Sequence, residues 1–133
     1  MKKVLFLMIA CAALFTACKK DKEKTTAEKV LGRWKVTNTV ENEFYNNTAH
    51  ITTQAGIASD YIDFREDGKV YSKDGNNPEY VSAYTITGDD KITFDGETFD
   101  IKTLTDNQFV LYNKYVYPNT PSNYDEITYN LYK

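Results

Sequence analysis

Cysteine and histidine are nearly absent from this sequence of 133 residues, which has two cysteines and one histidine. Cys11 and Cys18 lie in or directly after an apolar N-terminal stretch, so the chain beyond residue 18 has no thiol and no disulfide. A nucleophile paired with a histidine base, or a zinc site, needs more of these residues. We therefore expect no catalytic site and no metal or other cofactor. We interpret His50, which lies in the least periodic segment, as an exposed loop residue.

Basic runs and glycine-rich loops are also lacking. The formal net charge is −3 and becomes −5 if residues 1–17, with their two lysines, are removed. A chain without a basic stripe or a glycine-rich phosphate loop is not expected to bind nucleic acid. Five of its carboxylates occupy predicted turns, where aspartate is favoured: Asp67, Asp89, Asp90, Asp95 and Asp106. Asp63 and Asp100 alternate with apolar residues, and we expect both to face water.

The longest apolar run covers only residues 4–15 and follows Lys2 and Lys3. It is too short to span a membrane, which takes about 20 residues, but it is typical of a secretory signal peptide. Phe15-Thr16-Ala17-Cys18 resembles the bacterial lipobox. The resemblance implies that residues 1–17 are removed, that Cys18 carries a lipid, and that the protein is anchored to a membrane. We expect this to be the outer membrane, with the domain facing the periplasm or the cell surface.

Residues 18–28 are rich in lysine and acidic side chains and predict a disordered tether before a domain over residues 29–133. The Lys20–Glu23 stretch allows two interpretations. It is either a solvated spacer or a match to the lysine-plus-acidic signals that send some lipoproteins to the cell exterior. A short helical turn is expected over residues 26–31, capped by Thr25 or Thr26.

Alternation of apolar and polar residues predicts eight strands joined in sequence, with no crossover helix. In the first of them, Trp34, Val36 and Val40 share one face. Between the first and second strands, residues 42–60 lack clear periodicity and are expected to form a long loop, with a short helix near 53–58. The order is typical of an all-β, antiparallel up-and-down barrel or a strongly curved sheet, and a barrel removes exposed sheet edges. The predicted strands cover residues 30–41, 61–65, 69–72, 79–87, 91–94, 97–104, 108–116 and 124–132.

Gly32-Arg33-Trp34 opens the first strand and is similar to the Gly-x-Trp signature of lipocalins. The order of the segments that follow resembles small lipocalin-like lipoproteins over residues 28–133. The resemblance implies an eight-stranded lipocalin-like barrel whose base is formed by Gly32 and plugged by Trp34. It also implies a basic residue from a late strand over the tryptophan. No arginine follows Arg65, and Lys133 comes directly after the last predicted strand.

Loop lengths predict which end of the barrel is open. The connections near Trp34 are tight, whereas three of those at the opposite end are long, so we expect the mouth opposite Trp34. The candidate ligand-binding residues at this mouth are Phe44, Tyr45, Tyr80, Tyr117 and Tyr124. An alternative is that these aromatic residues only cover the open end of the core.

Two functions fit this sequence. The first is binding of a small apolar or amphipathic ligand at the open end of the barrel. The second is a non-catalytic structural or interaction subunit with a solid core, which docks another envelope protein. Bulky side chains such as Trp34, Phe64 and Phe109 are able to fill much of an eight-stranded interior.

Overall fold

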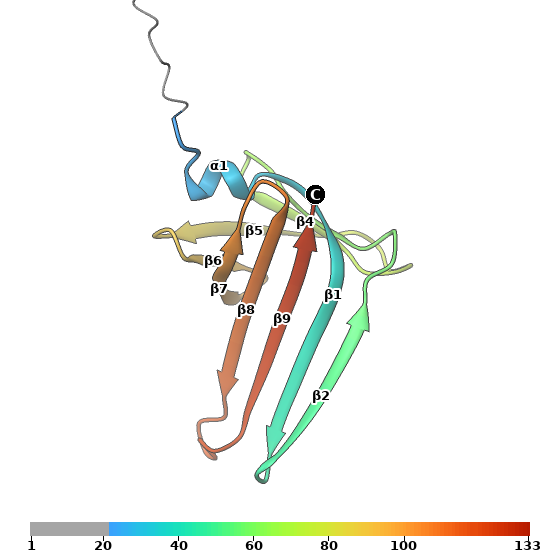
Figure 1. The fold of residues 1–133 in the computed structure, drawn as a ribbon, viewed down its shortest axis with the longest axis vertical. Coiled ribbons are helices and arrows are strands. Elements are labelled where there is room, and N and C mark those ends of the chain that lie inside the picture. Colours follow the sequence, from blue (N-terminus) through green and yellow to red (C-terminus); the bar gives the residue numbers. More distant parts are fainter. Residues whose placement is uncertain (1–21) are drawn as a thin grey trace, which may run out of the picture.

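The computed structural model describes residues 22–133 as one antiparallel β-structure with a single short helix (Figure 1). The predicted signal peptide and Cys18 lie outside the described residues. In chain order the elements are α1 (Thr26–Val30), β1 (Gly32–Tyr45), β2 (Thr48–Ala55), β3 (Tyr61–Phe64), β4 (Lys69–Lys73), β5 (Tyr80–Thr87), β6 (Lys91–Phe94), β7 (Glu97–Leu104), β8 (Gln108–Val116) and β9 (Tyr124–Tyr132).

The sheet closes into a barrel because β1 pairs with β9 as well as with β3. Eight strands, β1 and β3 to β9, form the closed barrel, and β2 is an extra strand beside β1. The predicted all-β antiparallel barrel is therefore confirmed. Seven of the predicted strands correspond to β3–β9 within one residue at each end.

Strand β2 corrects the prediction for residues 42–60. Instead of a long loop with a helix near 53–58, β1 runs on to Tyr45 and a two-residue turn leads into β2. Asn46 and Asn47 occupy this turn with φ of 49° and 61°, which is the conformation that favours asparagine in tight hairpins. All eight residues of β2 are exposed, so the strand has no buried face and no period-two pattern. His50 is exposed, as expected, but it lies on this strand rather than in a loop.

Four strands continue beyond the closed part of the barrel. β3 pairs only with residues 32–35 of β1, and β7 pairs with β8 only as far as Tyr112. Beyond these points β2, β1, β9 and β8 pair with one another in a four-stranded extension, which we call the distal sheet (Figure 1). It comprises β2, residues 38–45 of β1, 112–116 of β8 and 124–130 of β9.

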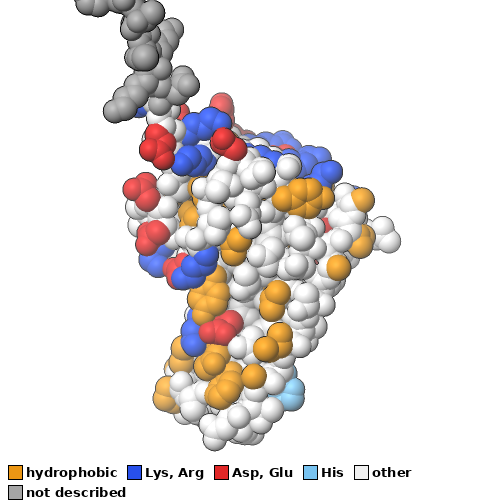
Figure 2. Space-filling view, in the orientation of Figure 1, with side chains coloured by type: hydrophobic (Ala, Val, Ile, Leu, Met, Phe, Trp, Pro, Cys, Tyr) orange, Lys and Arg blue, Asp and Glu red, His pale blue; other side chains and the backbone are white. Residues whose placement is uncertain are grey.

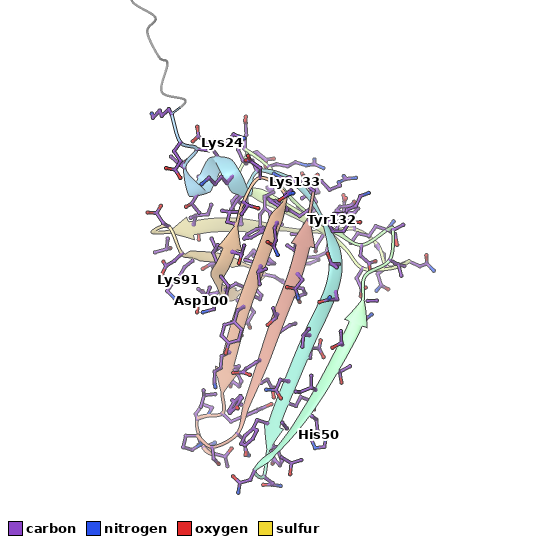
Figure 3. All side chains as sticks on the ribbon, viewed as in Figure 1. Lys24, His50, Lys91, Asp100, Tyr132 and Lys133 are labelled. Carbon is purple, nitrogen blue, oxygen red and sulfur yellow. The ribbon has the colours of Figure 1, made fainter. Side chains whose placement is uncertain are left out.

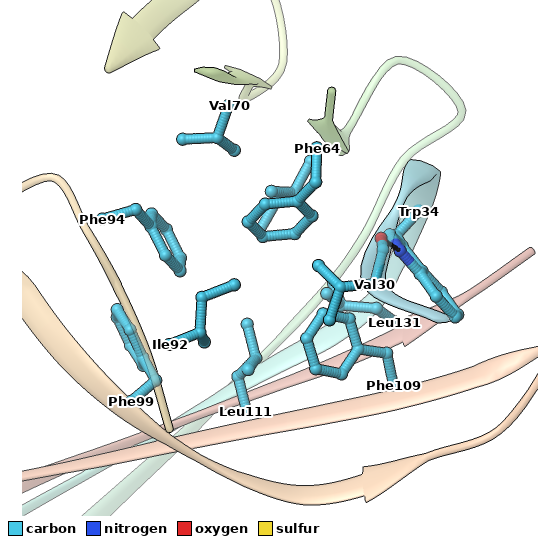
Figure 4. Packing of buried hydrophobic residues seen from close by; sticks show 11 residues of the cluster. Val30, Trp34, Phe64, Val70, Ile92, Phe94, Phe99, Phe109, Leu111 and Leu131 are labelled. Atoms are coloured by element: carbon cyan, nitrogen blue, oxygen red, sulfur yellow. Dashed lines mark hydrogen bonds between the residues drawn. The ribbon is translucent and has the colours of Figure 1, made fainter. Parts of the chain in front are cut away.

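Large side chains fill the end of the barrel nearest α1 (Figure 4). Trp34 is fully buried, its ring lies 5.1 Å from that of Phe109, and its Nε1 donates a 2.7 Å hydrogen bond to the Val30 carbonyl. Around it the core is almost entirely aromatic and branched aliphatic. Its buried members are Val30, Trp34, Ile62, Phe64, Val70, Ile92, Phe94, Phe99, Phe109, Leu111 and Leu131.

Helix α1 closes this end of the barrel. Thr25 is its N-cap, and Glu28 completes a capping box, which confirms the first of the two expected caps. The helix begins inside the stretch that the sequence assigns to the tether.

Figure 2 shows charged side chains concentrated around this end of the molecule. Within residues 22–133, no helix has the length and apolar character needed to cross a membrane.

Asp63 does not face water as its alternation predicted. It is only 9 % exposed, because two arginine side chains cover it: Arg33, its partner on β1, and Arg65, two residues further along the chain. Their guanidinium groups lie 3.4 Å and 3.2 Å from its Oδ2. Asp100 is half-buried, and its two oxygens accept hydrogen bonds from Lys91 and Lys102 (Figure 3).

Candidate functional site

A cavity of about 270 Å³ lies in the barrel at the end opposite Trp34. Residues from β1 to β6 and β9, and from the connections after β2, β4 and β6, line it. The mouth is therefore where the loop lengths predicted it. The lining residues are Val36, Thr39, Glu41, Gln54, Ala55, Gly56, Asp60, Tyr61, Ile62, Ser72, Lys73, Asp74, Tyr80, Ser82, Phe94, Asp95 and Tyr129.

The floor of the cavity is apolar and rests on the core. Ile62 and Phe94 are buried, and Val36 and Tyr129 pack against the same cluster. Phe94 is stacked on Phe99 at 4.8 Å between ring centroids, so it forms a fixed base. The sequence fills the closed half of the barrel with aromatic rings and leaves the other half open above Phe94.

Asp60 holds two parts of the rim together. Its Oδ2 accepts a 2.8 Å hydrogen bond from the Ile57 amide, and its Oδ1 accepts a 2.7 Å bond from the Gly75 amide. These backbone hydrogen bonds lower the pKa of the Asp60 carboxyl group. The carboxylate is 7 % exposed and links the β2–β3 connection to the β4–β5 turn.

A β-bulge in β1 decides which side chains enter the cavity. The register of β1 against β9 shifts between Val36 and Asn38. Trp34 and Val36 point inward before the bulge, and Thr39 and Glu41 line the cavity after it. Val40 is therefore on the opposite face from Trp34 and Val36, which corrects the predicted alternation.

Gly56 packs directly on this bulge. Its amide donates a 2.9 Å hydrogen bond to the Thr37 carbonyl, and a Cβ at this position would lie 2.0 Å from the Val36 carbonyl oxygen. No side chain fits between the two backbones. Glycine is needed here for close approach, since residues 56–60 have to cross the bulge to reach β3.

Charged groups ring the mouth above the apolar floor. Four carboxylates and a single lysine, Lys73, belong to the lining. The Asp60 carboxylate accepts hydrogen bonds from two backbone amides. The other three carboxylates, those of Glu41, Asp74 and Asp95, lie around the opening. Tyr80 approaches Asp95, and this interaction raises the pKa of the Tyr80 hydroxyl. The cavity thus combines an apolar base with an acidic, tyrosine-containing rim.

A family model described as a lipocalin-like domain matches residues 30–111 of the chain. The chain belongs to the lipocalin-like domain family. No curated protein in the comparison matches it. The match begins at the end of α1, covers Gly32 and Trp34 and ends inside β8, so it contains most of the closed barrel.

In this lipocalin-like domain, Gly32 and Trp34 form the base as expected. Gly32 has a φ of 105°, which favours glycine, and Lys133 covers the adjacent tryptophan with its Nζ 4.0 Å from the ring. The Lys133 ammonium donates hydrogen bonds to the carbonyls of Leu31 at 2.6 Å and Lys29 at 3.3 Å. Lys133 is therefore the basic partner that the resemblance implied.

The structure separates the five residues predicted to bind ligand. Tyr80 alone of the five lines the mouth cavity. Phe44 and Tyr124 stack on each other at 4.9 Å on the distal sheet. The Tyr117 hydroxyl donates a 2.5 Å hydrogen bond to Asp125 there, and Tyr45 is 55 % exposed at the end of β1. The ends of β1, β8 and β9 in the distal sheet, with the turn that joins β8 to β9, carry these four aromatic residues beyond the mouth.

A second, shallower hollow of about 180 Å³ lies on the distal sheet. Glu41 lines both hollows, so the second continues the acidic surface of the first. Asn123 connects the two hairpin ends nearby, because its Oδ1 accepts a 3.2 Å hydrogen bond from the Asn46 amide. The lining residues are Glu41, Glu43, Asn113, Tyr115, Asp125, Glu126 and Ile127.

Most cavity residues were missed by sequence reasoning. Thr39, Gln54, Ser72 and Ser82 are small or polar, and alternation alone assigns such residues to the solvent face. Ser72 and Ser82 could have been found, because each lies two residues from an inward-facing residue, Val70 or Tyr84, and alternate residues of a strand share a face. For Thr39 and Glu41 the signal was hidden by the bulge. Within residues 22–133, no group of three histidine, cysteine or acidic side chains is placed to hold a metal ion.

Proposed function

We propose that this protein is a lipid-anchored envelope lipoprotein whose lipocalin-like barrel binds a small apolar or amphipathic ligand in the mouth cavity. The observation that carries this proposal is the half-filled interior, with about 270 Å³ of open volume above Phe94. Small-molecule sites are concave, largely apolar and usually about 300–1,000 Å³ in volume. At about 270 Å³ the cavity is slightly smaller than that range, so its ligand is small.

Family membership supports a binding role. An eight-stranded barrel has an interior just wide enough to be filled by side chains or to hold one small ligand. Here the closed half is filled and the open half is hollow. The polar groups at the rim would orient a ligand whose apolar part contacts Ile62 and Phe94.

The lipid anchor would set the orientation of the barrel. Lys24, close to the start of the described residues, forms a 3.4 Å ion pair with Asp106 in a turn at the closed end. A tether running from Cys18 to this point would join the closed end to the outer membrane. The mouth would then face away from the bilayer, toward the periplasm or the cell exterior. More than one acyl chain on Cys18 would give stable anchoring.

The cavity hypothesis is tested by a nuclear magnetic resonance titration of residues 22–133 with 1-octanol. Ser82 lines the cavity, whereas its neighbour Ala83 points outward and is exposed. Ser82→Trp should fill the cavity and remove the saturable shifts of the floor residues. Ala83→Trp adds the same ring outside and should leave them unchanged. Saturable shifts that survive in Ser82→Trp, or that are absent from the unsubstituted protein, would contradict cavity binding.

One observation favours the alternative of a non-catalytic interaction subunit. The distal sheet exposes large apolar side chains, with Ile51 68 %, Tyr45 55 % and Tyr115 52 % exposed. Exposed aromatic residues of this kind are enriched at protein interfaces. A photocrosslinking residue at Tyr45 in intact cells should then give one discrete adduct with an envelope protein, and none at Asp89 on the closed end. Adducts at neither position would exclude this alternative.

A further inference from the structure

We propose that the ligand of the mouth cavity is an organic ammonium ion, an amine or quaternary ammonium group carried on a short apolar body. This inference rests on the proposed binding function of the cavity and names the chemical class of its ligand. It follows from the combination of aromatic rings and carboxylates that form no ion pair within residues 22–133, above an apolar floor.

Four aromatic rings line the cavity, and two of them are free to contact a cation. Arg33 already lies 4.0 Å from the centre of the Tyr61 ring, and Phe94 is stacked on Phe99. Tyr80 on the rim remains, and so does Tyr129 on the floor, whose ring meets Phe99 in an edge contact at 5.8 Å rather than in a stack. The faces of aromatic rings attract cations, and this attraction is used to recognise quaternary ammonium groups.

Among the described residues, three carboxylates of the lining have no cationic partner. Within residues 22–133, none of Glu41, Asp74 and Asp95 forms an ion pair, in contrast to Asp63 and Asp100. Lys73 is the single cation of the lining and does not pair with any of them. A cationic ligand would supply the missing charge, whereas an anionic ligand would be repelled.

The three carboxylates act on one point of the cavity. Burial raises the pKa of the Tyr129 hydroxyl, and the charges of Glu41, Asp74 and Asp95 raise it further. The Tyr129 hydroxyl also has no hydrogen-bond partner among residues 22–133, so it can accept a bond from an N–H donor of the ligand. An amphipathic cation could therefore place its charge among the three carboxylates and the Tyr129 hydroxyl, with its apolar body on the floor.

A metal ion fits this arrangement less well than an organic cation. Metal coordination needs several ligands within about 2.0–2.6 Å of one point. Within the described residues, no three acidic or histidine side chains are gathered closely enough. An ammonium group needs only the summed attraction of nearby charges and ring faces, which dispersed carboxylates can provide.

Three probes with the same tail and different head groups test the inference: octyltrimethylammonium, 1-octanol and octyl sulfate. Their dissociation constants for residues 22–133 are measured below the micellar range by calorimetry. We expect octyltrimethylammonium to bind about tenfold more tightly than octanol and octyl sulfate to bind most weakly. Added sodium chloride should weaken only the binding of the ammonium probe.

Variants locate the effect in the cavity. Glu41→Gln combined with Asp95→Asn should weaken ammonium binding about tenfold and should weaken octanol binding much less, because octanol carries no charge. The matched control, Glu66→Gln with Asp89→Asn, removes the same charge at the closed end and should leave both unchanged. Asp95 has a φ of 53°, a conformation that asparagine tolerates, so Asp95→Asn alone serves as a milder variant.

The outcomes separate this inference from the proposed function. Equal or tighter binding of octanol or octyl sulfate would overturn the preference for ammonium and leave the binding function intact. An equal loss in the closed-end control would also overturn it. Failure of all three probes to bind would contradict the binding function itself.

Discussion

The ammonium group of Lys133 lies 4.0 Å from the centre of the Trp34 ring and joins the last residue of the chain to its first strand. This contact seals the closed end, since the same ammonium donates hydrogen bonds to the carbonyls of Lys29 in α1 and of Leu31 directly after it. Trp34 fills this end of the barrel, and the open cavity lies at the other end. We therefore expect the closed end to carry stability and the open end to carry binding.

Replacement of Trp34 by alanine should be among the most destabilising single changes. The side chain is completely buried and bonded to Val30, so its loss should lower the free energy of unfolding by about 3–5 kcal/mol. Urea unfolding followed by far-ultraviolet circular dichroism measures this loss. Tryptophan fluorescence would not serve, because Trp34 is the single tryptophan and the variant lacks it. Lys133→Met keeps most of the covering side chain and should cost only about 1 kcal/mol. A loss below 1 kcal/mol for Trp34→Ala would contradict its role as a plug.

Gly56→Ala tests the close approach of two backbones at the bulge. The added Cβ would lie 2.0 Å from the Val36 carbonyl oxygen, and backbone atoms cannot move aside as a flexible side chain does. We expect a loss of about 2 kcal/mol or more and a displaced rim. Ala58→Gly in the same connection is the control, with an expected loss below about 1 kcal/mol. Equal stability of Gly56→Ala and the unsubstituted protein would show that the connection shifts freely.

Asp60 should make the rim sensitive to acid. Amide hydrogen bonds lower its folded-state pKa below the ordinary value of 3.8. In the range below that value the unfolded state binds more protons, so the stabilisation present at neutral pH is lost as the pH falls through the folded pKa. Asp60→Asn should cost about 2–3 kcal/mol at pH 7 and reduce the slope of stability against pH below about 4. Unfolding midpoints between pH 2.5 and pH 7 test this, and an unchanged slope would contradict it.

Lipidation at Cys18 stays a prediction, and Cys18→Ser tests it directly. Without the thiol the chain should remain an uncut precursor or appear in the soluble fraction, because no acyl chains would hold it on the membrane. Mass spectrometry of the membrane fraction should find an acylated chain that begins at Cys18. The adjacent substitution Lys19→Ser leaves the thiol in place and should not change the distribution. A mature chain that starts elsewhere, or lacks an acyl mass, would contradict the lipoprotein assignment.

Much of the barrel was predictable because one face of each short strand is buried. Asp63 separates Ile62 from Phe64, and Thr93 separates Ile92 from Phe94, so β3 and β6 show the alternation of apolar and polar residues clearly. In β8 the buried Phe109 and Leu111 also lie two residues apart, although Val110 between them is apolar. Strand β2 was not predictable in the same way. Both of its faces are exposed, so residues 48–55 do not need alternating apolar and polar side chains, and their sequence shows no strand pattern.

The candidate site was only partly predictable. The position of the mouth followed from the loop lengths, and Tyr80 was correctly placed there. Phe44 and Tyr124 were expected beside it but stack on the distal sheet, because β1 continues as a strand past the end of the barrel. Asp63 was expected in water and is buried, since two arginines from its surroundings satisfy its charge.

By itself, the sequence determined the all-β class, the seven regular strands, the tryptophan plug and the end that opens. The class, the strands and the open end depend on local alternation, turn residues and connection length, which are properties of neighbouring positions along the chain. The plug followed from the resemblance of Gly32-Arg33-Trp34 to the Gly-x-Trp signature. The tertiary structure alone decided the pairing of β1 with three strands, the bulge near Val36 and the cavity lined by Glu41 and Tyr129. These depend on contacts between residues far apart in the chain, and a one-residue bulge reverses which side chains face inward without changing the local pattern.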